Sequence, residues 1–213
     1  MHQNNPYSDA LTQSRQKFSQ CLPQEVARIK KVSWDAGPQV FTLPFLNESY
    51  QIAYPSGHIN KESGGEDVNV ILQILILHYL TGGYQPLKNQ WITFKELPGG
   101  NIYLQPFLAR AVRPVVKAFG SCPRLLLDAG RTLGGRPLGL GDASVVLYPF
   151  PEIPVAYIVW AGDEEFPPNA TVLFDASASG FMPTEDYAVL GEILAGYLKR
   201  AAASIAKKDG QEC

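Results

Sequence analysis

The sequence predicts an α+β protein with a largely antiparallel sheet and helices packed on it. Several apolar stretches show helical spacing and end at glycine or proline. Other runs are short, rich in β-branched and aromatic residues, and separated by Pro-rich or acidic turns. Neither an internal repeat nor a linker longer than a turn interrupts the chain. We therefore expect a single domain over residues 1–213, with an ordered core of about residues 9–205 and helix-rich and strand-rich subregions.

The first third is expected to contain two helical segments and a β-hairpin. Residues 9–31 have helical character, and Pro23 begins the second segment because proline suits a first helical turn. After a turn over residues 34–38, the runs VFTLPFL and SYQIAY flank Asn47-Glu48, which predicts a hairpin. The following SGHIN is typical of a polar loop.

A helix is predicted over residues 68–80, closed by Gly82-Gly83. Its polar residues Asn69 and Gln73 are four residues apart and share one face. His78 lies on the opposite side of this helix, so we expect it to face the interior. A buried histidine needs a hydrogen-bond partner, most often a backbone carbonyl, or a bound ligand or metal. His78 is therefore a candidate ligand-binding residue.

The middle of the chain is expected to start with a second hairpin, because WITFKELPGGNIYL carries turn-forming residues at positions 98–100. A helix then covers residues 106–119, and Pro114 must kink or divide it. Pro123 begins a further helix that ends at Gly134-Gly135.

Three strands and one long helix are predicted for the last third. The strands are SVVLYPF, VAYIVWAG and ATVLFDAS. Thr184 precedes Glu185 and Asp186, which predicts a helix N-cap followed by acids that complement the helix dipole. Apolar residues from Tyr187 onward recur at helical spacing, so the helix is expected to dock one face on the sheet.

The charges are distributed unevenly along the chain. No Lys, Arg or His occurs from Pro137 to Leu198, yet nine acids fall there. Between Leu97 and Gly141 the pattern is reversed, with six basic residues against the single acid Asp128. The simplest interpretation is that the two segments are solvated or neutralise each other.

Three of the basic residues fall at helical spacing on one predicted face: Arg110, Arg113 and Lys117. Such a face is either solvated, paired with acids, or an anion site for carboxylate or phosphate, which suits the planar donor fork of arginine.

The acidic segment contains its own candidate site. Asp163, Glu164 and Glu165 follow a strand that ends in Trp160, and Asp175 ends the next strand. Carboxylates at strand ends can bind a hard cation or act as general acids and bases, and they can equally form a solvated turn. A site shared with Asp175 requires the intervening chain to loop back across the sheet.

Recognised catalytic and cofactor motifs are missing from the sequence. It contains no G-x-S-x-G, H-E-x-x-H, P-loop or G-x-G-x-x-G, and its three cysteines form no C-x-x-C pair, so no cofactor and no metal site is implied. The net charge of -2 argues against nucleic-acid binding. The longest apolar run is too short to span a bilayer and no signal-peptide core occurs, so we expect a cytoplasmic protein that is not in a membrane.

Four segments resemble the bacterial and archaeal "domain of unknown function 3786" family. They are GGEDVNVILQILILHYL, WITFKELPGGNIYLQPF, VAYIVWAGDEEFPPNATVLFDASA and MPTEDYAVLGEIL, and the resemblance covers about residues 25–200. It implies a cytoplasmic protein of mainly anaerobic organisms, some relatives of which carry an added iron–sulfur segment near corrinoid or one-carbon metabolism. This chain has no such cysteine segment, and the family supplies no catalytic residues to transfer.

Three functions remain compatible with the sequence. The first is a non-catalytic module that binds a small ligand or cofactor, such as a tetrapyrrole or metal-linked one, with His78, Trp160 and the acidic strand end around the site. The second is a module that binds a basic partner protein through the acidic face. The third is an enzyme that uses Asp163, Glu164, Glu165 and Asp175, with or without a divalent cation. Taken together, these three functions predict that the protein's binding partner is a small molecule or another protein.

Overall fold

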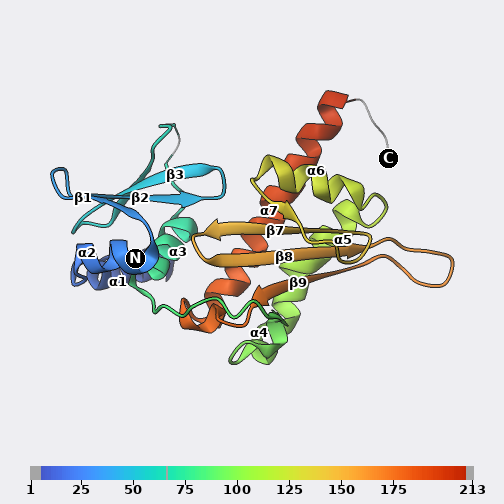
Figure 1. The fold of residues 1–213 in the computed structure, drawn as a ribbon, viewed down its shortest axis with the longest axis horizontal. Helices are drawn as coiled ribbons and strands as arrows, with labels where there is room; N and C mark the ends of the chain where they lie inside the picture. Colours follow the sequence, from blue (N-terminus) through green and yellow to red (C-terminus); the bar gives the residue numbers. More distant parts are fainter. Residues whose placement is uncertain (1–5, 66, 210–213) are drawn as a thin grey trace, which may run out of the picture. The chain divides into compact units, whose positions relative to one another are not determined.

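The computed structural model describes residues 6–65 and 67–209, and these residues divide into two compact units (Figure 1). The first unit contains the chain up to Gln85 together with Gly180–Met182. The second contains Pro86–Ser179 and the chain from Pro183 onward. The short segment Gly180–Met182 therefore returns from the C-terminal half of the chain to the first unit.

The first unit combines three helices with a four-stranded antiparallel sheet. Its helices are α1 (Pro6–Ser19), α2 (Pro23–Lys30) and α3 (Val70–Thr81). Its strands are β1 (Ser33–Asp35), β2 (Val40–Phe45), β3 (Glu48–Ala53) and β4 (His58–Lys61), in the order β1-β2-β3-β4. The β2–β3 hairpin pairs Phe45 with Glu48, which places its turn at the predicted Asn47-Glu48.

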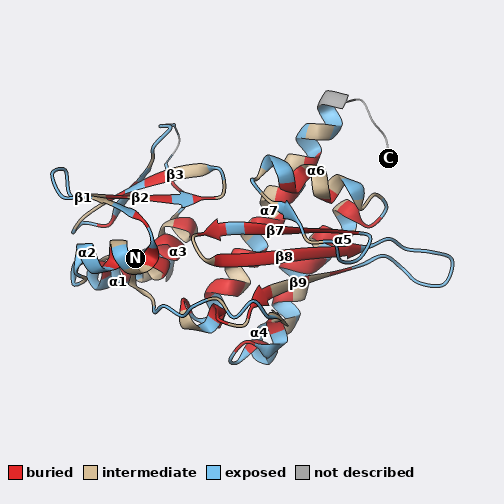
Figure 2. Cartoon of the chain, viewed as in Figure 1, coloured by how far each residue is buried: buried red, intermediate tan, exposed pale blue. Residues whose placement is uncertain are grey.

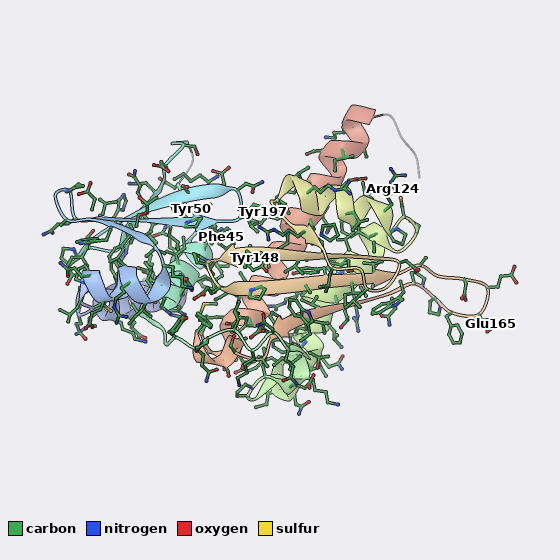
Figure 3. All side chains as sticks on the ribbon, in the orientation of Figure 1. Phe45, Tyr50, Arg124, Tyr148, Glu165 and Tyr197 are labelled. Atoms are coloured by element: carbon green, nitrogen blue, oxygen red, sulfur yellow. The ribbon has the colours of Figure 1, made fainter. Side chains whose placement is uncertain are left out.

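Aromatic residues fill much of the core of the first unit. Phe18 of α1 packs on Phe41 of β2 with ring centroids 5.6 Å apart, and Trp34 lies 4.5 Å from the same ring. Phe45 and Tyr50 meet edge to face across the hairpin (Figure 3). Helix α3 is apolar on most sides and almost wholly buried, because α1 packs along it.

The second unit has a five-stranded antiparallel sheet and four α-helices. Its strands are β5 (Trp91–Thr93), β6 (Arg136–Pro137), β7 (Ala143–Phe150), β8 (Ile153–Trp160) and β9 (Asn169–Asp175), in the order β5-β9-β8-β7-β6. Its helices are α4 (Gly100–Phe107), α5 (Arg113–Phe119), α6 (Arg124–Thr132) and α7 (Thr184–Asp209). The described residues also form three short helical segments: η1 (Phe94–Glu96), η2 (Leu108–Val112) and η3 (Ala178–Gly180).

The core of the second unit lies between its sheet and α7, which passes behind the strands in Figure 1. The phenol of Tyr157 on β8 is fully buried and donates a hydrogen bond of 2.9 Å to the Gly191 carbonyl of α7. Phe94 and Phe107 stack with centroids 4.0 Å apart and both contact Phe174 of β9. Strands β7 and β8 are buried along almost their whole length (Figure 2).

The structure confirms the α+β class with antiparallel pairing, although the strands form two sheets. The three predicted strands of the last third appear as β7, β8 and β9, paired as successive neighbours. One segment predicted as a loop is instead a strand, because the SGHIN residues from His58 onward pair with β3 and form β4.

The predicted hairpin in residues 91–104 is wrong. Only Trp91–Thr93 forms a strand, and it pairs with β9. Thr93 and Glu96 then form a reciprocal capping box that starts a helical turn, and α4 begins directly after Gly99. Sequence reasoning took the Pro-Gly-Gly triplet for a hairpin turn, whereas it is the start of a helix.

The helix predicted over residues 106–119 is divided, as its internal proline requires. Pro106 lies inside α4, and Pro114 lies in the first turn of α5. Between them, η2 is a π-helical segment, in which the wider turn accommodates the missing amide donor of Pro114. The final helix begins at Thr184 as predicted, but the Thr184 hydroxyl donates to the Pro98 carbonyl at 2.7 Å.

Candidate functional site

Lys30 is a buried cation that the sequence analysis did not single out. It is the last residue of α2, and only 2% of its surface is exposed. A lysine this deeply buried is unusual unless its charge is paired. In the described part of the chain, no carboxylate forms an ion pair with it.

A backbone carbonyl and two aromatic faces surround the Lys30 ammonium instead. Its Nζ donates a hydrogen bond to the Gly83 carbonyl oxygen. The same atom lies 4.9 Å from the ring centroid of Tyr79 and 5.4 Å from that of Phe181, within the range of cation–π attraction. The Tyr79 hydroxyl also donates to the Lys30 carbonyl at 3.0 Å, which ties α3 to the end of α2.

A glycine allows this arrangement. Gly82 follows α3, and a Cβ there would collide with the carbonyl oxygen of Phe181. Only glycine lets the Gly180–Met182 segment approach so closely, and this approach supplies the Phe181 ring near Lys30.

The surroundings make Lys30 a weaker base than an ordinary lysine. Burial lowers the pKa of Lys30 to about 8, and the nearby Lys17 cation also lowers it, while Cys21 has a smaller opposite effect. Burial in turn raises the pKa of the Cys21 thiol, although the Lys17 and Lys30 cations oppose this. Lys30 therefore loses its proton at a lower pH than an ordinary lysine does.

Lys30 lines a cavity of about 310 Å³ within the first unit. Its wall comes from the segment after α1, from α2, and from the end of α3. We call it the Lys30 cavity, and its polar residues are Gln20, Cys21, Glu25, Lys30 and Thr81. Apolar side chains complete the wall, namely Leu22, Val26, Ile29 and Leu80.

Thr81 contributes an unsatisfied polar group to this wall. Its Oγ1 atom is buried and has no hydrogen-bond partner among the residues that the structure describes. A buried hydroxyl without a partner costs free energy, so its presence beside the Lys30 cavity is notable.

The cavity thus combines an apolar wall with a few polar groups of different kinds. The amine of Lys30 can donate hydrogen bonds or act as a nucleophile, Thr81 can donate or accept, and Glu25 can accept. Apolar walls with a small number of placed polar groups are typical of small-molecule sites.

His78 faces a neighbouring helix, in keeping with its expected position on the inner side of α3. It is half-buried on α3 and faces α1, where its Nε2 lies 3.0 Å from the Ser14 hydroxyl oxygen. The Ser14 hydroxyl donates its only proton to the Ala10 carbonyl, so Nε2 of His78 is the donor in this contact. This nitrogen therefore serves helix packing and is not directed at a ligand.

Asp175 is a structural anchor for the edge of the second sheet. Its carboxylate accepts hydrogen bonds from the backbone amides of Lys88, Gln90 and Ser177, and from the Ser177 hydroxyl at 2.6 Å. Burial alone would raise the pKa of Asp175, but these hydrogen bonds outweigh it and hold the pKa below its ordinary value. The carboxylate has little capacity left for a ligand.

The acids Asp163, Glu164 and Glu165 lie in the exposed loop between β8 and β9, and Figure 3 shows Glu165 near the tip of this loop. Asp163 accepts from the amides of Glu165 and Phe166 at 2.9 and 2.7 Å and so stabilises the turn. Trp160 pairs with Asn169 at the start of the loop, whereas Asp175 ends β9. Asp175 lies about 20 Å from Asn169 along β9. The site that Asp175 was expected to share with the loop acids is therefore not formed.

The basic face is also dispersed. Arg110 lies in the π-helical η2 and Lys117 in α5, so the wider turn between them disturbs their expected spacing. Arg110 approaches Glu192 of α7 at 3.8 Å, and Arg113 and Lys117 are exposed. This weak, exposed pair is a point at which the basic and acidic segments meet. Among the described residues, no group of three or more His, Cys, Asp or Glu side chains could hold a metal ion.

A known protein-family profile matches most of the chain. The profile described as "Domain of unknown function (DUF3786)" matches residues 23–197. The chain belongs to this family. The matched DUF3786 region includes Lys30 and Thr81, so these parts of the cavity lie within the family domain. No curated protein and no solved structure matches the chain.

Among the described residues of this DUF3786 protein, no helix is both long and apolar enough to cross a membrane.

Sequence reasoning missed the Lys30 cavity although a signal was present. Lys30 follows Val26 by four residues, which places both on the same face of α2, and both are buried. A lysine on the apolar face of a short helix is a candidate buried cation. The unpartnered Thr81 and the aromatic neighbours come from distant parts of the chain, and only the folded structure reveals them.

Proposed function

We propose that this protein is a non-catalytic module that binds a small ligand in the Lys30 cavity. One observation carries the proposal: a buried cation without a carboxylate partner in the described chain and a buried hydroxyl without any partner line the same cavity. The amine is stabilised by one carbonyl and two aromatic rings and the hydroxyl by no described partner, so a molecule with a hydrogen-bond acceptor would offset part of the cost of burying them.

The composition of the wall defines the ligand further. Leu22, Val26, Ile29 and Leu80 favour an apolar body, and Glu25 disfavours a strongly anionic one. The ligand is therefore a small, largely apolar molecule with one uncharged acceptor group. A large planar macrocycle such as a tetrapyrrole does not match a cavity of about 310 Å³.

Backbone amide NMR tests this proposal with benzamide, acetophenone and benzoate as probes. Benzamide and acetophenone are expected to shift the amides of residues 20–22, 29–30 and 80–82 in a saturable manner, and benzoate is expected to bind more weakly. Lys30→Met should abolish the effect, whereas the exposed Lys95→Met should leave it unchanged. If no probe shifts these amides, the proposal is wrong.

A second candidate function is binding of a basic protein partner through the loop between β8 and β9. The observation that favours it is the exposure of two aromatic residues, Trp160 at 39% and Phe166 at 67%, around the acids Asp163, Glu164 and Glu165. Exposed aromatic residues often act as anchors of an interface, and the surrounding acids favour a partner with positive charge.

This candidate function predicts that either of two substitutions weakens binding of the partner protein. Phe166→Ser should weaken capture of the partner by removing the anchor, and Glu165→Lys should weaken it by reversing the charge. Pull-downs at low and high salt measure both effects, with Glu152→Lys on the β7–β8 turn as a charge control. An identical set of captured proteins for all variants would exclude the loop as an interface.

A further inference from the structure

Three large apolar side chains are exposed at the end of the second sheet that carries the β8–β9 loop. The exposed fractions are 44% for Leu140, 39% for Trp160 and 67% for Phe166. The turn that carries Leu140 packs against Trp160, because a Cβ at Gly141 would lie 3.3 Å from the Trp160 ring. We call these three side chains the loop patch. Exposed apolar patches of this kind often mark a surface that binds another protein.

Two carboxylates of the same loop have no partner in the described chain. Asp163 is used within the loop, where it accepts two backbone amides, and Asp142 accepts the Ala161 amide at 2.7 Å. Glu164 and Glu165 are exposed, and neither forms an ion pair with another described residue. The loop patch is therefore apolar with negative charge beside it, which favours a partner surface of positive charge.

A basic surface of this kind lies on α5 and α6 of the same unit. Arg113 and Lys117 are exposed and four residues apart in α5, so they share one side of this helix. Arg124, at the start of α6, is also exposed. None of these three residues, which we call the basic surface, has a carboxylate partner among the residues that the structure describes. The neutralisation within one chain that the sequence suggested is thus not made by these charges.

The loop and the basic helices are neighbours in the second unit. A Cβ at Gly120, the residue after α5, would lie 2.6 Å from the Pro168 side chain, so the end of α5 packs on the base of the β8–β9 loop. Figure 3 shows Arg124 and Glu165 in the same half of the second unit. Neighbouring surfaces of opposite charge suit a two-fold dimer, because one rotation places each molecule's loop on the other molecule's helices.

We propose that the loop patch docks on the basic surface of a second copy of this chain, and that a two-fold axis repeats the contact. This inference rests on the second candidate function, binding of a basic protein partner, and names that partner. Trp160 and Phe166 are the apolar anchors, and the loop carboxylates pair with the cations of the second copy. The long stems of arginine and lysine cover aromatic rings while their charged ends reach carboxylates, so the two surfaces match in both respects.

Sedimentation velocity of the full wild-type chain measures this association. We expect a monomer–dimer equilibrium with a Kd on the order of 10 μM at about 50 mM salt, because the loop patch is small. Raising the salt to about 500 mM should weaken the association about tenfold, because exposed ion pairs are screened. A chain that stays monomeric at about 200 μM in low salt would overturn the proposal.

Charge reversal on each surface tests which residues make the contact. The loop variant, Glu164→Lys with Glu165→Lys, should be monomeric because like charges then face each other. The helix variant, Arg113→Glu with Lys117→Glu, should be monomeric for the same reason. A mixture of the two variants should form a dimer, because the reversed loop meets the reversed helix and the unaltered surfaces meet in the second contact. A folding defect in either variant would not produce this rescue.

A matched control keeps the change in net charge and leaves both surfaces intact. Lys88→Glu with Lys95→Glu replaces two exposed bases on either side of β5 and should dimerise like the wild type. If this control also becomes monomeric, net charge and not the named surfaces governs the association, and the proposal is overturned. Loop and helix variants that dimerise on their own would overturn it as well.

The remaining outcomes separate this inference from the function on which it rests. If the wild type is monomeric but captures a basic protein in the salt-dependent pull-down, self-association is overturned and the second candidate function stands. If it neither dimerises nor captures a protein, both fail. Wild-type species larger than a dimer would overturn the two-fold arrangement, because a contact that does not close on itself extends into chains.

Discussion

At the scale of single residues, the central feature is a lysine whose burial is compensated by neutral groups. A carboxylate partner would raise the pKa of Lys30 and hold it as a permanent cation. The Gly83 carbonyl and the Tyr79 and Phe181 rings stabilise the cation less strongly, so burial dominates and the pKa falls to about 8. The residue is therefore poised between charged and neutral forms near physiological pH.

The Lys17 cation is expected to contribute to this low pKa. Lys17→Gln removes a like charge near Lys30, so the pKa of Lys30 should rise from about 8 toward the ordinary value. Carbon-13 NMR of the lysine side chains, followed through a pH titration, measures the change. Lys95→Gln, in the second unit, should leave the titration of Lys30 unaltered. An unchanged Lys30 midpoint in Lys17→Gln would show that the two charges do not interact.

Thr81 should show opposite effects on stability and on binding. Thr81→Val removes a buried hydroxyl without a partner, so the free energy of unfolding should rise by about 1 kcal/mol in the absence of ligand. Urea unfolding measures this change. Binding of benzamide should weaken in the same variant, because its acceptor loses a donor.

A matched control exists on α1. Thr12 is exposed and its hydroxyl donates to the Ser8 carbonyl at 2.9 Å, so Thr12→Val should give no stabilisation. A destabilised Thr81→Val variant would mean that its hydroxyl has a favourable role in the unliganded protein.

At the scale of elements, the spacing of apolar residues along the sequence predicted most of the regular helices and strands. Strands β7 to β9 and helix α3 carry their pattern in continuous sequence, and the structure confirms them. The start of α4 was missed because Pro98-Gly99-Gly100 suits both a hairpin turn and a helix start. The Thr93 and Glu96 capping box was the signal that favours a helical turn.

The candidate site could be predicted only in small part. His78, Trp160, Asp163 and Asp175 were chosen because their residue types are chemically capable, but hydrogen bonds to Ser14 and Ser177 give two of them structural roles. The wall of the Lys30 cavity comes from α2, the end of α3 and the segment after α1, and the Phe181 ring reaches Lys30 from a distant part of the chain. Such long-range proximity leaves no pattern in a single sequence.

Asp175 should stabilise the edge of the second sheet by joining β9 to the segment before β5. Asp175→Asn replaces one acceptor oxygen by a donor, so at least one of the amides of Lys88, Gln90 and Ser177 loses its partner. We expect a loss of about 2 kcal/mol in the free energy of unfolding at pH 7, measured in urea. Glu164→Gln in the exposed loop is the control and should be neutral.

The same substitution should also change the pH dependence of stability. The pKa of Asp175 is lower in the folded protein than its ordinary value of 3.8, so its contribution is complete above this value and is lost as the pH falls through the folded pKa. The difference in stability between wild type and Asp175→Asn should therefore shrink below pH 3.8. A difference that stays constant at low pH would assign the loss to packing.

At the scale of the whole molecule, we expect one cooperative domain although two compact units can be distinguished. Gly180–Met182 is part of the first unit, whereas its neighbours in sequence belong to the second. Because of this shared connection, we expect the unfolding of one unit to destabilise the other. In a variant with Trp91→Phe and Trp160→Phe, the fluorescence of Trp34 reports on the first unit. In Trp34→Phe, the fluorescence of Trp91 and Trp160 reports on the second unit. Coincident urea midpoints are expected, whereas two separate midpoints would establish two domains.

The claim that the buried Lys30 amine beside the Lys30 cavity has a lowered pKa has one direct test. Trace labelling of the native wild-type chain with acetic anhydride, from pH 6 to 10, gives the reactivity of every lysine by mass spectrometry. We predict that Lys30 labelling rises with a midpoint near pH 8, well below the ordinary value of 10.5 for a lysine, and that benzamide suppresses it. A Lys30 that stays unlabelled in the native protein while the exposed lysines react would show that it is a closed structural cation, and the account would be contradicted.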